Sequence, residues 1–363
     1  MRTKLFSLFL VFMMVPAISM AGNEFTGKHT KQKKIKKEFT VSANDLLKIE
    51  NSYGNVDLTT WDQNRVVIEV VVTTSGNDEK EVMDRLKEID VDFYQGNNMV
   101  RAVTEIEENS GSWWNKLFDF NSGVSMEINY RVKAPVKNPV DLSNDYGSIS
   151  VDKLTGNAEI SCDYGRLMIG DLLGDKNVLS FDYTQNSNIH YIKNGHIRAD
   201  YSEFTIEEAG SLDIAADYTE GHIVKVEHLV FNNDYGSIQV DRIRDLEGRG
   251  DYLGVKLGQL YRSAEIAMDY GSLSILKLMP GLKTLQISSD YTGIRLGYDP
   301  EAAFNFEIST SYGNVDGFDE GFTLNKKHES GGDHFYSGYH LSDKTGANIA
   351  IETSYGNITL NEK

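Results

Sequence analysis

Cysteine and proline are scarce in this sequence, which has one cysteine, Cys162, and five prolines among its 363 residues. A single cysteine excludes an intrachain disulfide framework and a cysteine-based zinc cluster. Few prolines suit a body of paired strands, because proline cannot donate its backbone nitrogen to a sheet. Cys162 falls on the inward side of a predicted strand and has no base motif beside it, so we expect a buried small hydrophobe rather than a nucleophile.

Basic residues are also few, since 36 Lys and Arg stand against 54 Asp and Glu and give a formal net charge of −18. This balance argues against nucleic-acid binding, which needs a basic surface for phosphate contacts. The sequence contains no phosphate-binding glycine loop, no Gly-x-Ser-x-Gly motif and no His-Glu-x-x-His motif. We therefore expect a non-catalytic protein without a cofactor.

Long apolar runs are limited to one, from Leu5 to Ile18, which follows Arg2 and Lys4 and precedes small residues ending at Ala21. This order is typical of a secretory signal peptide. The run is too short for a good transmembrane helix, although an uncleaved anchor is the alternative. We expect residues 1–21 to be removed near Ala21 and the protein to be exported, to the periplasm or the cell surface.

A lysine-rich segment, residues 22–37, comes next and carries six lysines between Lys28 and Lys37. Like charges in a short polar stretch repel one another and bury little, so we expect a flexible linker. The alternative is a weak contact of Lys28–Lys37 with a membrane surface of anionic lipid or lipopolysaccharide.

A short repeat dominates the rest of the chain, in which Asp-Tyr or Ser-Tyr is usually followed by glycine. Its twelve tyrosines are Tyr53, Tyr146, Tyr164, Tyr183, Tyr201, Tyr218, Tyr235, Tyr252, Tyr270, Tyr291, Tyr312 and Tyr355. From Tyr146 to Tyr312 they recur every 17 to 21 residues. A fixed short period of this kind indicates a solenoid.

Apolar residues alternate on both sides of each repeat tyrosine. They stand four and six residues before it and three and five after it, as Ile160, Leu167 and Ile169 do around Tyr164. A period of two indicates strands, and the change of parity places a corner at the tyrosine. We expect the ring to point inward, because it shares parity with the upstream apolar residues, and the following glycine to supply a positive φ. The chain is thus predicted to be all-β dominated, a single-stack parallel β-solenoid (right-handed β-helix) with a small α+β N-terminal cap.

The residue before the tyrosine is aspartate in nine consecutive copies. These are Asp145, Asp163, Asp182, Asp200, Asp217, Asp234, Asp251, Asp269 and Asp290. Aspartate caps turns by accepting backbone N–H groups, which is the interpretation we prefer. The alternative is an edge that binds calcium, because stacked carboxylates repel each other and a cation would relieve the repulsion.

Two regions interrupt the repeat. Residues 38–135 hold the first rung and predicted strands at 66–72, 91–94, 99–106 and 126–133 with a helix at 77–88, which together form the cap. Solenoid repeats fill 136–316. Residues 317–363 are expected to form a mobile loop and a C-terminal capping rung. The loop contains His328, His334 and His340, whose spacing matches no zinc site and whose role is left open.

An aromatic stretch inside the cap contains Trp113, Trp114 and Phe118. These side chains either pack against the cap or form an exposed aromatic finger that contacts a partner or a sugar. They are our candidate partner-binding residues.

The strings IENSYGNVDL, LSNDYGSISV, ISCDYGRLMI and IETSYGNITL resemble the repeats of the bacterial putative-adhesin β-strand-repeat family, whose function is unknown. The resemblance implies an exported cell-envelope β-solenoid and supplies no functional residues. We expect an adhesion or scaffolding/interaction module with a protein or glycan of the cell envelope as partner. An envelope-stress or signalling accessory is the alternative, and a carbohydrate-active enzyme is less favoured.

Overall fold

The computed structural model describes residues 27–106 and 123–363. The chain divides into two compact units, Met1–Ile169 and Gly170–Lys363. The predicted signal peptide and the residues Trp113, Trp114 and Phe118 lie outside the described residues. Among the residues that are described, no helix is long and apolar enough to cross a membrane.

The first unit contains stacked strand pairs on either side of the repeat corners. They are β2 (Leu46–Ser52), β3 (Val56–Trp61), β8 (Val140–Asp145), β9 (Ser148–Leu154) and β10 (Ala158–Asp163). Strand β8 pairs in parallel with β2 and with β10, and β3 pairs in parallel with β9. Ile49, Leu142 and Ile160 stand in register and are buried, so the predicted strand alternation is confirmed.

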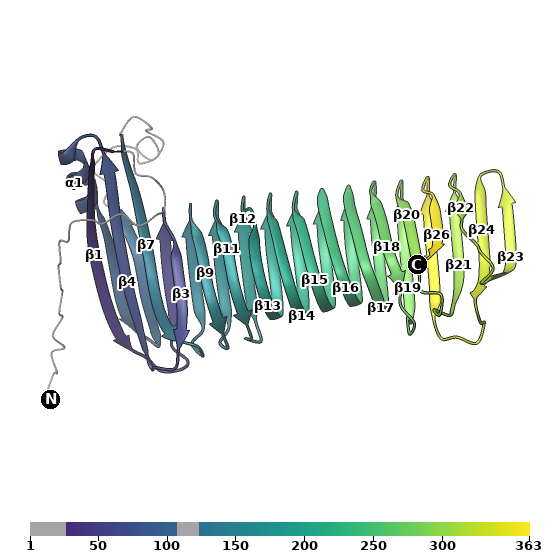
Figure 1. Ribbon diagram of the computed structural model, residues 1–363, viewed down its shortest axis with the longest axis horizontal. Helices are drawn as coiled ribbons and strands as arrows, with labels where there is room; N and C mark the ends of the chain where they lie inside the picture. The colour runs from purple at the N-terminus through teal and green to yellow at the C-terminus, as the bar shows by residue number, and fades with distance from the viewer. Residues whose placement is uncertain (1–26, 107–122) are drawn as a thin grey trace. The chain divides into compact units, whose positions relative to one another are not determined.

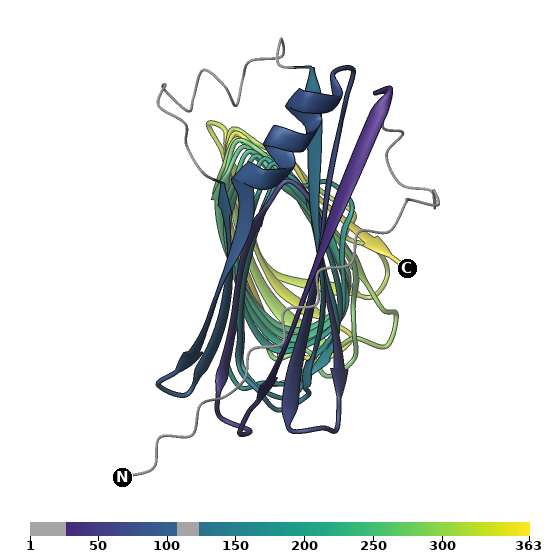
Figure 2. The ribbon, with the colours of Figure 1, turned by 90° about the vertical axis from the view of Figure 1, so that its left-hand side faces the viewer.

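The predicted α+β cap is confirmed and lies against the first rung. It comprises β1 (His29–Thr40), β4 (Arg65–Gly76), α1 (Glu79–Glu88), β5 (Ile89–Gly96), β6 (Met99–Ile106) and β7 (Val124–Pro135). Asp78 caps the helix by accepting two backbone N–H groups, and the helix packs on β1 and β4 (Figure 2). Strands β6 and β7 pair in parallel with β2 and β3, which covers the edges of the rung that they would otherwise expose.

The lysine-rich segment forms a strand, so the prediction of a flexible linker at 22–37 is wrong for residues 29–37. Strand β1 pairs with β4 along its whole length in antiparallel register. Lys31 forms an ion pair of 2.6 Å with Glu79, and the Lys37 ammonium lies 5.8 Å from the centre of the Phe93 ring. Long lysine stems cover apolar surface while their charges stay in water, and lysines are common on edge strands.

The second unit is a stack of strands that follow one another along the chain (Figure 1). They are β12 (Asn177–Asp182), β13 (Ser187–Asp200), β14 (Glu203–Asp217), β15 (Glu220–Asp234), β16 (Gly236–Asp251), β17 (Leu253–Asp269), β18 (Ser272–Leu278), β19 (Thr284–Asp290) and β20 (Gly293–Tyr298). From β12 to β17 each strand pairs in parallel with the next. Strand β18 continues the stack beside the first half of β17, and β19 continues it beside the second half.

One apolar column runs through this unit four residues before each tyrosine. Its members are Leu179, Ile197, Ile214, Phe231, Gly248, Ile266, Ile287, Ile351 and Ile308, in register. Gly248 is the one small residue, and a Cβ there would lie 2.3 Å from the Phe231 ring. The large ring on one rung therefore fills the space that the glycine leaves on the next.

We predicted that the C-terminal copy of the repeat, within 317–363, caps the end of the stack. This prediction is wrong, because the copy does not lie at the end. Strand β25 (Asn348–Ser354) lies between β19 and β21 (Phe304–Ser311) and pairs in parallel with both. Strand β26 (Ile358–Glu362) similarly pairs with β20 and with β22 (Val315–Asp316). The last segment of the chain is thus inserted into the stack.

The predicted loop around the three histidines is an antiparallel hairpin, β23 (Phe322–Ser330) and β24 (Asp333–His340), that pairs with β21. His340 is buried among aromatic rings, and its Nδ1 lies 2.6 Å from the Ala302 carbonyl oxygen. Packing of this kind accounts for order where the polar sequence indicated a loop. The hairpin covers the outer edge of β21.

Candidate interaction surface

The repeat tyrosines point outward, which corrects the prediction that their rings lie inside. All twelve have φ between 51° and 63°, in the left-handed region. The eleven from Tyr146 to Tyr355 are exposed by 43% to 65%. A left-handed residue breaks the two-residue alternation of a strand, so parity with the upstream core no longer decides where the ring points.

Within the second unit the exposed rings form one continuous stack, which we call the tyrosine ladder. Its nine members, in spatial order, are Tyr183, Tyr201, Tyr218, Tyr235, Tyr252, Tyr270, Tyr291, Tyr355 and Tyr312. Neighbouring ring centres lie 4.8 to 5.1 Å apart and the ring planes differ by 1° to 9°. Neighbours cover the ring faces, so the ladder presents ring edges and hydroxyl groups to the solvent.

Two glycines that directly follow repeat tyrosines in the first unit have a different role from the predicted one. Gly147 and Gly165 do not adopt a positive φ. A Cβ on Gly147 would lie 1.8 Å from the carbonyl oxygen of Gly54, and a Cβ on Gly165 would lie 1.8 Å from that of Gly147. Glycine is required here because adjacent rungs approach too closely for a side chain.

The aspartates before the tyrosines link neighbouring rungs. In five pairs, the carboxylate of one accepts the backbone N–H of the next at 2.7 to 3.3 Å: Asp182–Asp200, Asp200–Asp217, Asp234–Asp251, Asp251–Asp269 and Asp269–Asp290. Capping therefore takes place between rungs. In the first unit, burial and then the adjacent Asp163 carboxylate raise the pKa of Asp145, so stacked carboxylates do repel.

Calcium removal tests the other interpretation of this column. In residues 27–106 and 123–363, no three His, Cys, Asp or Glu side chains gather in a way that could hold a metal ion. Because backbone N–H groups already occupy the carboxylates, we expect EDTA to leave the thermal unfolding midpoint unchanged. A lower midpoint that calcium restores would support a calcium edge at Asp145–Asp290.

Replacement of a ladder tyrosine should separate backbone strain from stacking. Tyr235→Ala and Tyr235→Gly both remove the ring, but only alanine keeps the cost of the left-handed conformation, about 1–2 kcal/mol. Glycine also increases the conformational entropy of the unfolded chain. This lowers stability by about 0.4–1 kcal/mol and offsets part of the strain that glycine relieves. We expect the glycine variant to be the more stable of the two by roughly 1 kcal/mol in urea unfolding. Equal stabilities, or a more stable alanine variant, would contradict a strained corner.

Alkaline pH should weaken the ladder. Desolvation in the stack, and then the neighbouring phenol groups, raise the pKa of Tyr201, Tyr235 and Tyr270 above the ordinary 10.0. The unfolded chain ionises first, so the stabilisation is fully present below pH 10 and is lost as the pH rises through the raised folded pKa. We expect the urea midpoint to fall above pH 10 while tyrosinate absorbance lags behind that of free tyrosine. Ionisation at the ordinary pKa would contradict this expectation.

Cys162 is buried, as its inward position on the predicted strand indicates. The side chain is fully buried, its Sγ lies 3.3 Å from the Gly147 carbonyl oxygen, and burial raises its pKa to about 12. A thiol with such a pKa is not a thiolate at neutral pH, so Cys162 is a structural hydrophobe, as predicted.

Comparison with known proteins gives structural similarity only. No family model and no curated protein matches the chain. A solved putative adhesin from Parabacteroides merdae is 9% identical, with 72% of this chain and 90% of that chain covered and a TM-score of 0.34. A putative adhesin from Parabacteroides distasonis is 11% identical, with 93% and 98% covered and a TM-score of 0.32. A putative cell adhesion protein from Clostridium sporogenes is 11% identical, with 92% and 100% covered and a TM-score of 0.20.

The fold follows from the strands themselves. Parallel rungs, in-register apolar columns and repeat corners make the chain a β-solenoid, with one short helix in the described residues. This is the fold implied by the resemblance of the repeats to the putative-adhesin β-strand-repeat family.

Proposed function

We propose that the chain is a non-catalytic, exported cell-envelope module for adhesion or scaffolding. The observation that carries the proposal is the tyrosine ladder, a regular exposed surface repeated along the second unit. Tyrosine is enriched at interfaces because it combines an apolar body with a polar tip. Solenoids characteristically use such extended surfaces to bind partners.

The ladder is ordered before any partner arrives. Each inner ring is held between two neighbours about 5 Å away, so binding would cost little further side-chain entropy. Within the described part of the chain, the hydroxyls of Tyr218, Tyr235 and Tyr252 make no hydrogen bond. These hydroxyls are free to bind a protein or glycan of the cell envelope.

Export rests on the predicted signal peptide, residues 1–21, with its apolar run from Leu5 to Ile18. The absence of catalysis rests on the missing sequence motifs. Both stand as part of the proposal, and both follow from the sequence.

A capture experiment with a conservative variant tests the proposal. The protein from residue 22 onward is immobilised and exposed to envelope fractions of its own organism. We expect wild type to retain an envelope protein or glycan, and the Y218F/Y235F/Y252F variant to lose most of it, since stacking remains and only hydroxyls disappear. Tyr94→Phe, at an exposed tyrosine outside the ladder, is the matched control. Retention of nothing by wild type, or equal retention by the triple variant, would contradict the proposal.

A further inference from the structure

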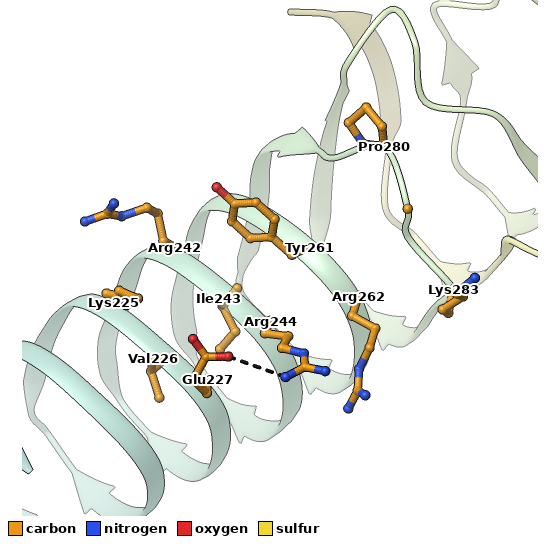
Figure 3. Close-up of a pocket in the computed structure, with 11 residues that line it drawn as sticks. Lys225, Val226, Glu227, Arg242, Ile243, Arg244, Tyr261, Arg262, Pro280 and Lys283 are labelled. Atoms are coloured by element: carbon orange, nitrogen blue, oxygen red, sulfur yellow. Dashed lines mark ion pairs between the residues drawn. The ribbon is translucent and has the colours of Figure 1, made fainter. Parts of the chain in front are cut away.

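A groove on the second unit gathers positive charge in an acidic chain. It encloses about 510 Å³ and is lined by Lys225, Arg242, Arg244, Tyr261, Arg262 and Lys283, together with Glu227 (Figure 3). We call it the cationic groove. Val226 and Ile243 are buried beneath it, so the residues that flank them along each strand point outward into solvent.

Three of the five cations in the cationic groove have acidic partners. Lys225 pairs with Glu208 at 2.7 Å, Arg244 with Glu227 at 3.6 Å and Arg262 with Asp245, which also pairs with His228. The two others, Arg242 and Lys283, are exposed and have no acidic partner within the described residues. Two positive charges therefore stand outside the ion pairs of the groove, in a protein of net charge −18.

An aromatic ring stands between these two free cations. Tyr261 is 40% exposed, and its hydroxyl donates a hydrogen bond of 2.8 Å to the side-chain oxygen of Gln259. The bond links the ring to its own strand, and the ring lies beside the turn formed by Pro280 and Gly281, where Gly281 adopts φ 99°. The groove thus combines an exposed aromatic surface with charges on both sides of it (Figure 3).

The spacing of these groups suits a chain-like ligand rather than a single ion. Arg242 lies on β16, Tyr261 on β17, and Lys283 directly before β19, so they occupy three successive turns. Adjacent strands lie about 4.8 Å apart, so two steps of the stack, roughly 10 Å, separate the backbones that carry the two free cations. Lys283 is also displaced along the strand direction, because its backbone lies beside Arg262 and not in the row of Arg242. A polymer with repeated acidic groups can reach both at once.

We propose that the cationic groove binds an acidic polysaccharide. Arg242 and Lys283 would bind its carboxylate, sulfate or phosphate groups, and Tyr261 would pack against a sugar ring between them. Nucleic acid is disfavoured, because the acidic remainder of the protein repels a long phosphate backbone. The inference rests on the proposed adhesion function and names the ligand class for a second surface, separate from the tyrosine ladder.

Binding to defined polymers tests the inference. The protein from residue 22 onward is titrated by calorimetry with polygalacturonate, dextran sulfate, a phosphomannan and neutral dextran. We expect at least one acidic polymer to bind at least tenfold more tightly than dextran, and the affinity to fall as salt rises. The three acidic polymers distinguish carboxylate, sulfate and phosphate as the recognised group.

Variants locate the site. R242Q/K283Q should lower the affinity about tenfold, because it removes both free cations, and Tyr261→Ala should lower it further. R198Q/R295Q makes the same change in net charge at exposed positions elsewhere in the unit and should bind as wild type does. Equal loss in both double variants would show non-specific attraction and overturn the site, as would the failure of every acidic polymer to exceed dextran. If the ladder still captures an envelope partner in that case, only this inference fails and the proposed function stands.

Discussion

Replacing Gly165 with alanine is expected to destabilise the first unit by about 3 kcal/mol. The new Cβ would lie 1.8 Å from the Gly147 carbonyl oxygen, which belongs to the backbone of the adjacent rung and cannot rotate away. Relief requires the two rungs to separate, and separation weakens the parallel hydrogen bonds beside the corner. A lower urea midpoint for the variant than for wild type would measure the effect.

A second glycine provides the control for this prediction. Gly293 stands two residues after the repeat tyrosine Tyr291, and a Cβ there would meet nothing within 4 Å. Gly293→Ala should change stability by no more than about 0.5 kcal/mol, as expected for an open surface site. If Gly165→Ala proved equally mild, close approach between rungs would not be the reason for the glycine.

The apolar columns could be predicted from the sequence because strand alternation depends only on parity. Ile160, Leu167 and Ile169 are buried where the pattern placed them. The direction of the tyrosine rings could not be predicted in this way, because parity holds only while every residue stays extended. A single left-handed residue, such as Tyr164 with φ 53°, breaks the rule at each corner.

The spatial order of the rungs also could not be predicted from the repeat pattern. A period shows that copies are equivalent but not which copies are neighbours, and in space Tyr355 stacks between Tyr291 and Tyr312.

Part of the cationic groove, in contrast, could have been predicted from the sequence. Lys225 and Arg242 each stand seven residues after a repeat tyrosine and are direct neighbours in the sheet. An alignment of charges on the tyrosines would have revealed this column.

Replacing Ile351 with aspartate is expected to destabilise the C-terminal part of the second unit by about 4 kcal/mol or more. Ile351 is 2% exposed and lies in register between Ile287 and Ile308. A carboxylate there would be buried among isoleucines without a partner. Thermal unfolding and hydrogen exchange of the backbone amides would measure the loss.

The insertion of β25 determines where that loss should appear. Because β25 joins β19 to β21, its release should expose amides of both strands and, through β21, of the β23–β24 hairpin. Glu352→Gln, at the neighbouring exposed position, should leave exchange unchanged and serves as the control. If β21 and the hairpin kept their protection while β25 lost its own, the C-terminal strand would be an edge element after all. Protection lost together across β19, β25 and β21 would instead show that the last segment of the chain holds the end of the solenoid together from within.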